Sequence, residues 1–281
     1  MKFGALEWII EENIAYLTIQ RPEVLNALNQ NLLSNFEEWL DRVEQELDQS
    51  THTYRCIVIK GAGEKAFVAG ADIHEFKDKS RSQGQEMSQR GQKVFKRIEE
   101  LPLPVVAYID GYALGGGAEL ALACHFRVGT KNTVIGFPEV KLGLIPGYGG
   151  TVRLSRIIGY SKALEWMTMA PYISAEEAYR RGALNVILEH SEDDSSSDKE
   201  GASELNSLEE LKKWLQPLIK MAPLAIKNVI LSTRSNTGIR ANDMDSLQRE
   251  SVLFGELFET QDANEGINAF IEKRSPKFQG K

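Results

Sequence analysis

Cysteine is scarce in this chain, which contains only two among its 281 residues. Cys56 and Cys124 lie far apart in apolar runs, as reduced core thiols do in cytosolic proteins. The sequence therefore excludes a disulfide framework. At 31.4 kDa, the chain is long enough to form one large domain with a substantial core, with or without a small appendage.

Long hydrophobic runs and an excess of positive charge are also missing. No uncharged apolar run approaches the roughly 18 to 20 residues of a membrane span, and the N-terminal segment, with Glu7, Glu11 and Glu12, has no signal-peptide pattern. The 33 Lys and Arg residues against 40 Asp and Glu residues give a net charge of −7, so the basic field that nucleic-acid phosphates attract is absent. We expect a cytoplasmic protein whose partners include neither a membrane nor a nucleic acid.

Several common motifs of catalysis and cofactor binding are absent as well. The four histidines show no metal-ligand spacing, so we predict no metal site. There is no Gly-x-Ser-x-Gly turn, and the segment from Gly147 to Gly150 lacks the lysine and the glycine spacing of a phosphate-binding loop. The sequence thus argues against metal chemistry, a serine nucleophile and a bound nucleoside triphosphate.

What the sequence does contain is an alternation of strand and helix patterns. Apolar runs at 8–10 and 15–19 flank the turn-prone segment Glu11–Asn13 and predict an N-terminal β-hairpin. Apolar runs at 56–59 and 104–109 predict further strands, whereas spacings of three and four residues over 32–47 and a polar segment at 84–100 predict helices. This alternation favours parallel βαβ units and an α/β fold. Asn29 is the expected N-terminal cap of the first helix.

The C-terminal part of the sequence is different in character. Residues 189–200 include no apolar side chain, and we expect a mobile surface insertion there. Only helical patterns follow, at 207–220, 223–233, about 243–259 and about 262–273. The predicted organisation is an α/β core at 1–188, an acidic, serine-rich insertion at 189–206 and a helical region at 207–281.

Two glycine-rich turns are the first candidates for chemistry. The segment Phe67–Ile73 follows a predicted strand and has small residues where a ligand would approach the backbone. In Gly111–Glu119 the glycines open a predicted helix, whose first N–H groups lack intrahelical partners. Two such fixed donors can stabilise the oxyanion of an enolate. Tight packing of a helix against a strand explains either turn taken alone.

Two carboxylates accompany these turns. Glu119 falls in the first turn of the predicted helix, inside an apolar stretch where a charge is costly unless it is paired or used. Glu139 follows 20 residues later (139 − 119). A charge interaction at the helix N-terminus is the alternative explanation for Glu119, and a surface loop is the alternative for Glu139. Because both acids occur beside both glycine turns, we favour a catalytic pair.

In six ordered segments that span nearly the whole chain, the sequence resembles the crotonase (enoyl-CoA hydratase/isomerase) superfamily. The matching segments are Arg21–Leu28, Ala66–Ile73, Gly111–Glu119, Pro138–Gly147, Gly149–Thr151 and Phe270–Arg274. The resemblance implies an α/β fold with a ββα spiral core. It also implies a helical C-terminal region used in oligomerisation, as a trimer or a dimer of trimers.

The resemblance further assigns roles to residues of this sequence. It implies that the N–H groups of Ala71 and Gly116 form an oxyanion hole, that Glu119 and Glu139 are the catalytic acids, and that Gly147 helps to hold the reacting water. Coenzyme A is expected to enter as part of the thioester substrate, with no separate cofactor. The positions expected to contact it are Val24, Leu25, Ala27, Ala69, Asp72, Ile73 and Lys273.

The expected activity is reversible syn-hydration of a 2-enoyl-CoA to a 3-hydroxyacyl-CoA, in fatty acid or amino acid degradation. An enoyl-CoA isomerase, or a hydratase of branched or functionalised acyl groups such as methylglutaconyl-CoA hydratase, is the alternative. Two acids favour hydration over isomerisation. An RNA-binding relative is disfavoured by the net charge of −7. The expected pocket walls are Phe76, Leu144, Tyr148 and Phe270.

Overall fold

The computed structural model describes residues 1–50, 52–188, 202–235 and 243–281. The chain divides into two compact units, of which unit 1 is Met1–Leu101 with Val105–Lys213, and unit 2 is Pro102–Pro104 with Trp214–Lys281. The division falls inside helix α7, Ala202–Ile219. The expected insertion at 189–200 lies outside the described residues. Within the described ranges, no helix combines the length and the apolar character that crossing a membrane requires.

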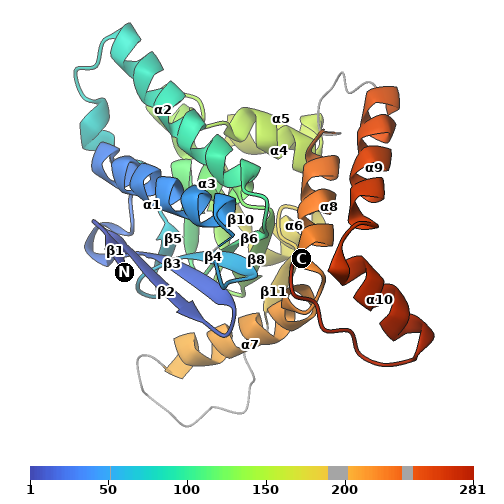
Figure 1. Ribbon diagram of the computed structural model, residues 1–281. Coiled ribbons are helices and arrows are strands. Elements are labelled where there is room, and N and C mark those ends of the chain that lie inside the picture. Colours follow the sequence, from blue (N-terminus) through green and yellow to red (C-terminus); the bar gives the residue numbers. More distant parts are fainter. Residues whose placement is uncertain (51, 189–201, 236–242) are drawn as a thin grey trace. The chain divides into compact units, whose positions relative to one another are not determined.

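A seven-stranded sheet is the larger sheet of the described part of unit 1 (Figure 1). Its strands, in spatial order, are β1 (Lys2–Phe3), β2 (Leu6–Glu11), β3 (Ile14–Ile19), β4 (Cys56–Gly61), β6 (Val105–Ile109), β8 (Phe126–Thr130) and β11 (Val186–Leu188). β2 and β3 form the expected antiparallel hairpin, which turns at Glu12 and Asn13 with positive φ angles. From β3 onward all neighbours are parallel, which confirms the α/β prediction.

A second, smaller sheet has the order β10 (Tyr172–Ser174), β9 (Val134–Gly136), β7 (Tyr112–Leu114) and β5 (Ala66–Val68) in the described residues. Three pairs of consecutive strands divide between the two sheets. In β4 and β5, in β6 and β7, and in β8 and β9, the first strand belongs to the large sheet and the second to the small sheet. A helix follows the first two pairs, namely α2 (Arg81–Glu100) and α3 (Gly116–Ala123). This is the expected ββα repeat.

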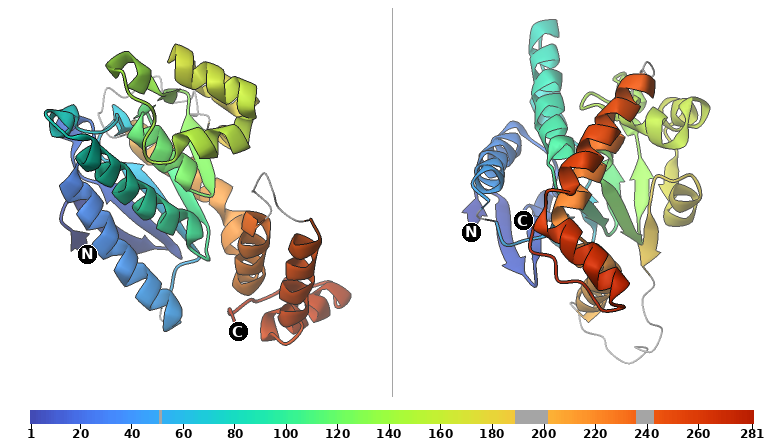
Figure 2. Two further views of the ribbon diagram at one scale, coloured as in Figure 1. Left: turned by 90° about the horizontal axis from the view of Figure 1, so that it is seen from above. Right: turned by 45° about the vertical axis from the view of Figure 1, so that its right-hand side comes forward.

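Local sequence signals explain where the helices of unit 1 begin. α1 (Gln30–Asp48) begins after Asn29, whose side chain accepts a hydrogen bond from the N–H of Leu32, as expected. α2 begins after Ser80, which forms a capping box with Gln83. Figures 1 and 2 show α1 and α2 side by side. The remaining helices of this unit are α4 (Gly150–Ile158), α5 (Tyr160–Met169) and α6 (Ala175–Arg180), with 3-10 turns η1 (Pro22–Val24), η2 (Ile73–Phe76) and η3 (Pro138–Leu142).

The core of unit 1 is mainly apolar where the two long helices meet the sheet. Trp39, Phe36 and Phe95 are buried, and Trp8 packs against Trp39 with ring centroids 5.8 Å apart. Both cysteines are free and buried, which confirms the prediction of reduced core thiols. Burial raises the pKa of each thiol to about 12, so neither is a nucleophile at neutral pH.

Unit 2 contains the helical region expected from the sequence. Its helices are α8 (Pro223–Ser235), α9 (Asp243–Leu257) and α10 (Gln261–Ile271), together with the end of α7. The Asn228 side chain donates a hydrogen bond of 2.9 Å to the carbonyl of Leu253 and so ties α8 to α9. The buried carboxylate of Asp262 accepts from the N–H groups of Gln279 and Gly280 and so anchors the C-terminal segment to α10.

Candidate active site

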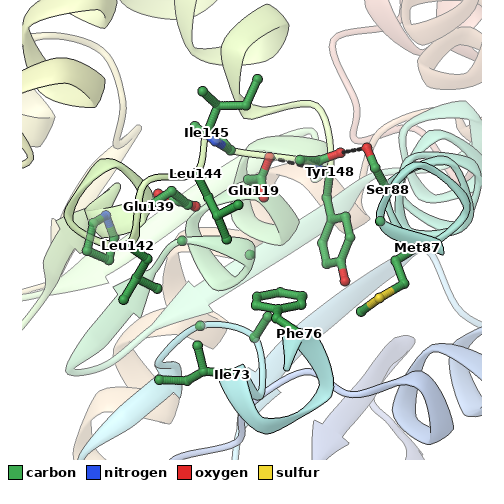
Figure 3. Close-up of a pocket in the computed structure, with 18 of the residues that line it drawn as sticks. Ile73, Phe76, Met87, Ser88, Glu119, Glu139, Leu142, Leu144, Ile145 and Tyr148 are labelled. Atoms are coloured by element: carbon green, nitrogen blue, oxygen red, sulfur yellow. Dashed lines mark hydrogen bonds between the residues drawn. The ribbon is translucent and has the colours of Figure 1, made fainter. Parts of the chain in front are cut away.

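A cavity of about 640 Å³ lies entirely within unit 1. It is bounded by the turn after β5, the start of α3, the segment from η3 to α4 and the first half of α2 (Figure 3). All five residues predicted to act in catalysis line it, namely Ala71, Gly116, Glu119, Glu139 and Gly147. The fold therefore brings together positions that are up to 76 residues apart in the sequence (147 − 71).

The two glycine-rich turns each leave a backbone N–H available at this cavity. Leu28 forms an isolated parallel bridge with Ala71, in which the bonded groups are the carbonyl of Gly70 and the N–H of Asp72. The N–H of Ala71 itself lies outside that bridge, because a parallel bridge bonds the residues on either side of the one it faces. Gly116 is the first residue of α3, so its N–H has no intrahelical acceptor. Both N–H groups are thus available to a ligand oxygen.

Glu119 lies on α3 and is only 2% exposed. Its Oε1 accepts hydrogen bonds from the N–H groups of Tyr148 and Gly150, each 2.7 Å long. Gly150 is the first residue of α4, so the carboxylate sits at the positive end of that helix. Burial raises the pKa of Glu119 to about 7, with a further contribution from Glu139, although the two N–H donors act in the opposite direction. A carboxyl with this pKa can accept and release a proton at neutral pH.

The segment Gly147–Gly150 that contacts Glu119 is held from two helices. The carbonyl of Gly147 accepts hydrogen bonds from Ser88 Oγ at 2.6 Å and Gln92 Nε2 at 3.0 Å, both on α2. The carbonyl of Tyr148 accepts from Arg153 Nη1 at 2.9 Å, and Arg153 pairs with Glu99 at 2.9 Å. These contacts fix the two N–H groups that bind Glu119.

Glu139 lies on η3 and is half-buried. Its Oε2 is buried and has no hydrogen-bond partner within the described part of the chain. Burial raises the pKa of its carboxyl group. A Cβ placed on Gly115 would lie 3.0 Å from Glu139 Oε1, which shows that the carboxylate reaches the N-terminus of α3. Because a buried oxygen without a donor is costly, Glu139 is suited to accept a hydrogen bond from a molecule in the cavity.

The apolar walls of the cavity agree in part with the sequence prediction. Phe76, Leu144 and Tyr148 line the cavity as expected, and the Tyr148 ring packs edge-on against Phe95 with centroids 5.6 Å apart. Met87 and Ile145 are further wall residues that the sequence analysis missed. Phe270 belongs to unit 2, so its part in the pocket stays a prediction.

The residues predicted to contact coenzyme A fall into three groups. Ala69 and Ile73 line the cavity, and the Asp72 carboxylate accepts a hydrogen bond from the N–H of His74 and so begins η2. Val24, Leu25 and Ala27 lie on the segment beside Ala69, whose N–H donates to the carbonyl of Leu25 at 3.0 Å. They are not part of the cavity lining.

Lys273, the third group, belongs to unit 2 and is exposed. Its contact with coenzyme A stays a prediction.

The sequence analysis missed Ser88, Gln92 and Arg153 altogether. A serine and a glutamine four residues apart on a polar helix face carry no signal that distinguishes them from solvated residues. An arginine in the first turns of a helix is equally inconspicuous. Their role depends on the loop that packs against them.

Comparisons with known proteins identify the family of this chain. The family model described as enoyl-CoA hydratase/isomerase matches residues 9–281. The chain is 38% identical to a short-chain-enoyl-CoA hydratase of Clostridium acetobutylicum over 265 residues, which cover 94% of this chain and 93% of that protein. It is 36% identical to a crotonyl-CoA hydratase of Syntrophomonas wolfei over 268 residues, which cover 95% of each protein. A solved structure of an enoyl-CoA hydratase from Bacillus anthracis is similar with a TM-score of 0.86 at 30% identity, and the match covers 99% of this chain and 100% of that one.

Proposed function

The chain belongs to the enoyl-CoA hydratase/isomerase family, and from this premise we propose that it is an enoyl-CoA hydratase. It adds water reversibly across the 2,3 double bond of a 2-enoyl-CoA thioester and gives a 3-hydroxyacyl-CoA. The observation that carries the proposal is that Glu119 and Glu139 line the same cavity as the available N–H groups of Ala71 and Gly116. Coenzyme A enters as part of the substrate, and no separate cofactor takes part.

The two N–H groups activate the substrate. They bind the thioester oxygen and stabilise the negative charge that collects there as the double-bond electrons move toward it. C3 then becomes electrophilic, and the intermediate is an enolate. The two dipoles are fixed by the backbone and need no reorganisation during the reaction.

The two carboxylates bind the reacting water and transfer its proton. The Glu119 Oε1 atom is already bound by two N–H donors, which leaves Oε2 to accept a hydrogen bond from one O–H of the water, while Glu139 Oε2 accepts a hydrogen bond from the other O–H. The water oxygen forms a bond to C3 and one of its O–H bonds breaks, with that proton passing to a carboxylate. C2 of the enolate then takes a proton from a carboxyl group of the pair, so that the net change is the addition of one water and the pair regains its starting protonation. Addition to one face follows because the acids lie on the same side of the cavity (Figure 3). Besides burial, the charge of Glu139 also contributes to the raised pKa of Glu119.

The test is to supply crotonyl-CoA and, separately, a 3-enoyl-CoA in water enriched in oxygen-18. A hydratase gives 3-hydroxybutyryl-CoA that carries the label, whereas an isomerase converts the 3-enoyl substrate to the 2-enoyl product without label. The Glu119→Gln/Glu139→Gln double variant sets the background rate. Unlabelled 2-enoyl product as the main outcome would establish the isomerase instead. A panel of straight and branched enoyl thioesters then identifies the preferred acyl group.

We also propose that the protein is a cytoplasmic homo-oligomer, a trimer or a dimer of trimers, that acts in fatty acid or amino acid degradation. Apolar side chains of α9 and of the turn that follows it support assembly, because Val252 on α9 is 50% exposed and Phe258 in the turn is 58% exposed in the single chain. Exposed apolar surface of this kind is commonly buried against another copy. Light scattering is expected to give a mass near three or six times 31.4 kDa. A monomer at micromolar concentration contradicts the proposal.

A further inference from the structure

One peptide group connects α2 to the carboxylate of Glu119. The carbonyl of Gly147 and the N–H of Tyr148 belong to the same peptide unit, and no cis peptide bond occurs in the described residues. In a trans peptide these two groups point in opposite directions. The carbonyl accepts from Ser88 and Gln92 on one side, and the N–H donates to Glu119 Oε1 at 2.7 Å on the other.

The donors on α2 are themselves connected. Gln92 Nε2 donates to Ser88 Oγ at 3.1 Å as well as to the Gly147 carbonyl at 3.0 Å. The Ser88 hydroxyl then donates to the same carbonyl at the short distance of 2.6 Å. Successive hydrogen bonds that run in one direction polarise one another, by roughly 10–30% per bond. A carbonyl that accepts two donors makes its own peptide N–H a stronger donor.

We propose that Ser88 and Gln92 are positioning residues for Glu119, which fix and polarise the Gly147–Tyr148 peptide and thereby strengthen the hydrogen bond that holds the carboxylate ionised. This inference rests on the proposed function in so far as Glu119 is the base that activates water. Ser88 contributes more than Gln92, because Ser88 is half-buried whereas Gln92 is exposed and shares its amide with solvent.

Other charged groups also face Glu119. These are Glu139 from η3, Arg153 from α4 with its partner Glu99 from α2, and the phenol of Tyr148. Among the described hydrogen bonds and ion pairs, none joins these side chains to Ser88 or Gln92. Replacing Ser88 therefore weakens the N–H of the Gly147–Tyr148 peptide as a hydrogen-bond donor and leaves these charged groups in place.

The test compares Ser88→Ala with Ser88→Thr and with a matched control, Ser155→Ala. Ser155 Oγ also donates to a backbone carbonyl, that of Thr151, at 2.8 Å, but that peptide does not contact a carboxylate. With a weaker donor the ionised form of Glu119 is less stable, so the acid limb of the pH profile of kcat/KM moves to higher pH. We expect a shift of about 0.5 pH in Ser88→Ala, no shift in Ser155→Ala, and restoration in Ser88→Thr, which keeps the hydroxyl.

A second measurement does not depend on activity. The carboxyl carbon of Glu119 is titrated by NMR in protein labelled with carbon-13 in glutamate, with the signal assigned by its absence in Glu119→Gln. The midpoint is expected to rise by about 0.5 pH in Ser88→Ala and by less in Gln92→Leu, an exposed substitution that leaves the packing of α2 intact. An unchanged midpoint in both variants overturns the inference. A uniform fall of kcat/KM at every pH with no shift overturns it too, since it shows a structural role only.

The hydratase function and the positioning role of Ser88 and Gln92 can be disproved independently of each other. If the wild-type protein hydrates no enoyl-CoA, the proposed function fails, yet a rise of the Glu119 midpoint in Ser88→Ala still supports the connection through the peptide. If the wild-type protein is active and the midpoint does not move, the function stands and the positioning role is lost.

Discussion

Glu119 and Glu139 face one cavity, but they are held in different ways. Glu119 lies on a helix, is 2% exposed and accepts hydrogen bonds from the N–H of Gly150, the first residue of α4, and from the N–H of Tyr148 just before that helix. Glu139 lies on the 3-10 turn η3, is half-buried, and one of its oxygens has no partner among the described residues. Burial raises the pKa of both carboxyls. Backbone N–H groups thus hold the Glu119 carboxylate in place, whereas the Glu139 carboxylate still has an oxygen that can accept a hydrogen bond from a ligand in the cavity.

This difference gives the two carboxylates different roles in binding water, which is consistent with hydration. Glu119 is held rigidly and can fix the position of a bound water. Glu139 Oε2 has no hydrogen-bond donor among the described residues and gains one when the water binds. Isolated burial without donors is unfavourable for a carboxylate, so the unsatisfied oxygen of Glu139 is itself an argument that this site holds a polar ligand.

Replacing either acid by its amide is expected to have the largest effect. Glu119→Gln keeps an oxygen that can accept from Tyr148 and Gly150, and Glu139→Gln keeps the size of the side chain, so both variants should fold. Each is expected to lower the turnover of crotonyl-CoA by about 10² to 10⁴, because an amide cannot accept the proton of water. Affinity for the thioester, measured by calorimetry, should change little. Turnover near that of the wild type removes the residue concerned from the mechanism.

Gly116→Val tests the oxyanion hole apart from both acids. A Cβ at this position would lie 3.0 Å from Leu28 Cδ1 and 3.4 Å from Tyr148 Cδ2, so a valine side chain crowds the cavity beside the Gly116 N–H and leaves both carboxylates in place. We expect turnover to fall at least about a hundredfold, since loss of one oxyanion donor costs about 2.7 to 4 kcal/mol.

Gly84→Val is the matched control for Gly116→Val. Gly84 also lines the cavity, and a Cβ there meets nothing within 4 Å. A folded and fully active Gly116→Val variant would show that this glycine serves packing only.

Between pH 4.5 and pH 7, stability is expected to depend on the protonation of Glu119. Its pKa is raised from 4.5 to about 7 in the folded protein, so the folded state binds the proton more tightly and stability falls as pH rises through this window. The difference of about 2.5 in pKa corresponds to a loss of up to about 3 kcal/mol between pH 4.5 and pH 7. Urea unfolding at pH 5 and pH 8 measures it. Glu119→Gln should flatten the dependence more than Glu139→Gln does, and an equal effect of the two variants would contradict the asymmetry.

The smallest effect is expected at the end of the turn that carries Glu139. Gly143 follows η3 with φ of 72°, and a Cβ there meets nothing within 4 Å. Gly143→Ala should therefore cost about 1 to 2 kcal/mol from backbone strain alone, together with a turnover loss of a few fold. Gly143→Asn, which tolerates this conformation better, should cost less in both thermal unfolding and turnover. Equal losses in the two variants would point to a ligand contact at Gly143 instead of strain.

Local features of the fold were legible in the sequence. The β2–β3 turn, the Asn29 cap, the free thiols and the helix that begins at Gly116 each depend on a few neighbouring residues. The helical C-terminal region was also predicted, with ends that differ by a few residues, such as 207–220 for α7 against the observed Ala202–Ile219. The two acids and the two turns were selected because their combination is unusual, although each alone had an ordinary explanation.

By itself, then, the sequence determined the strand and helix order, the free thiols and the residues that were candidates for chemistry, because periodicity, capping and backbone conformation act over a few residues. Only the tertiary structure decided how the candidates meet. The small sheet has strands of three residues, too short for a periodic pattern. Ser88 reaches the Gly147 carbonyl across 59 residues of sequence. The raised pKa of Glu119 and the unsatisfied oxygen of Glu139 arise from burial. This burial results from the packing of α2, α3 and α4 around one cavity, so it cannot be read from any single segment of the sequence.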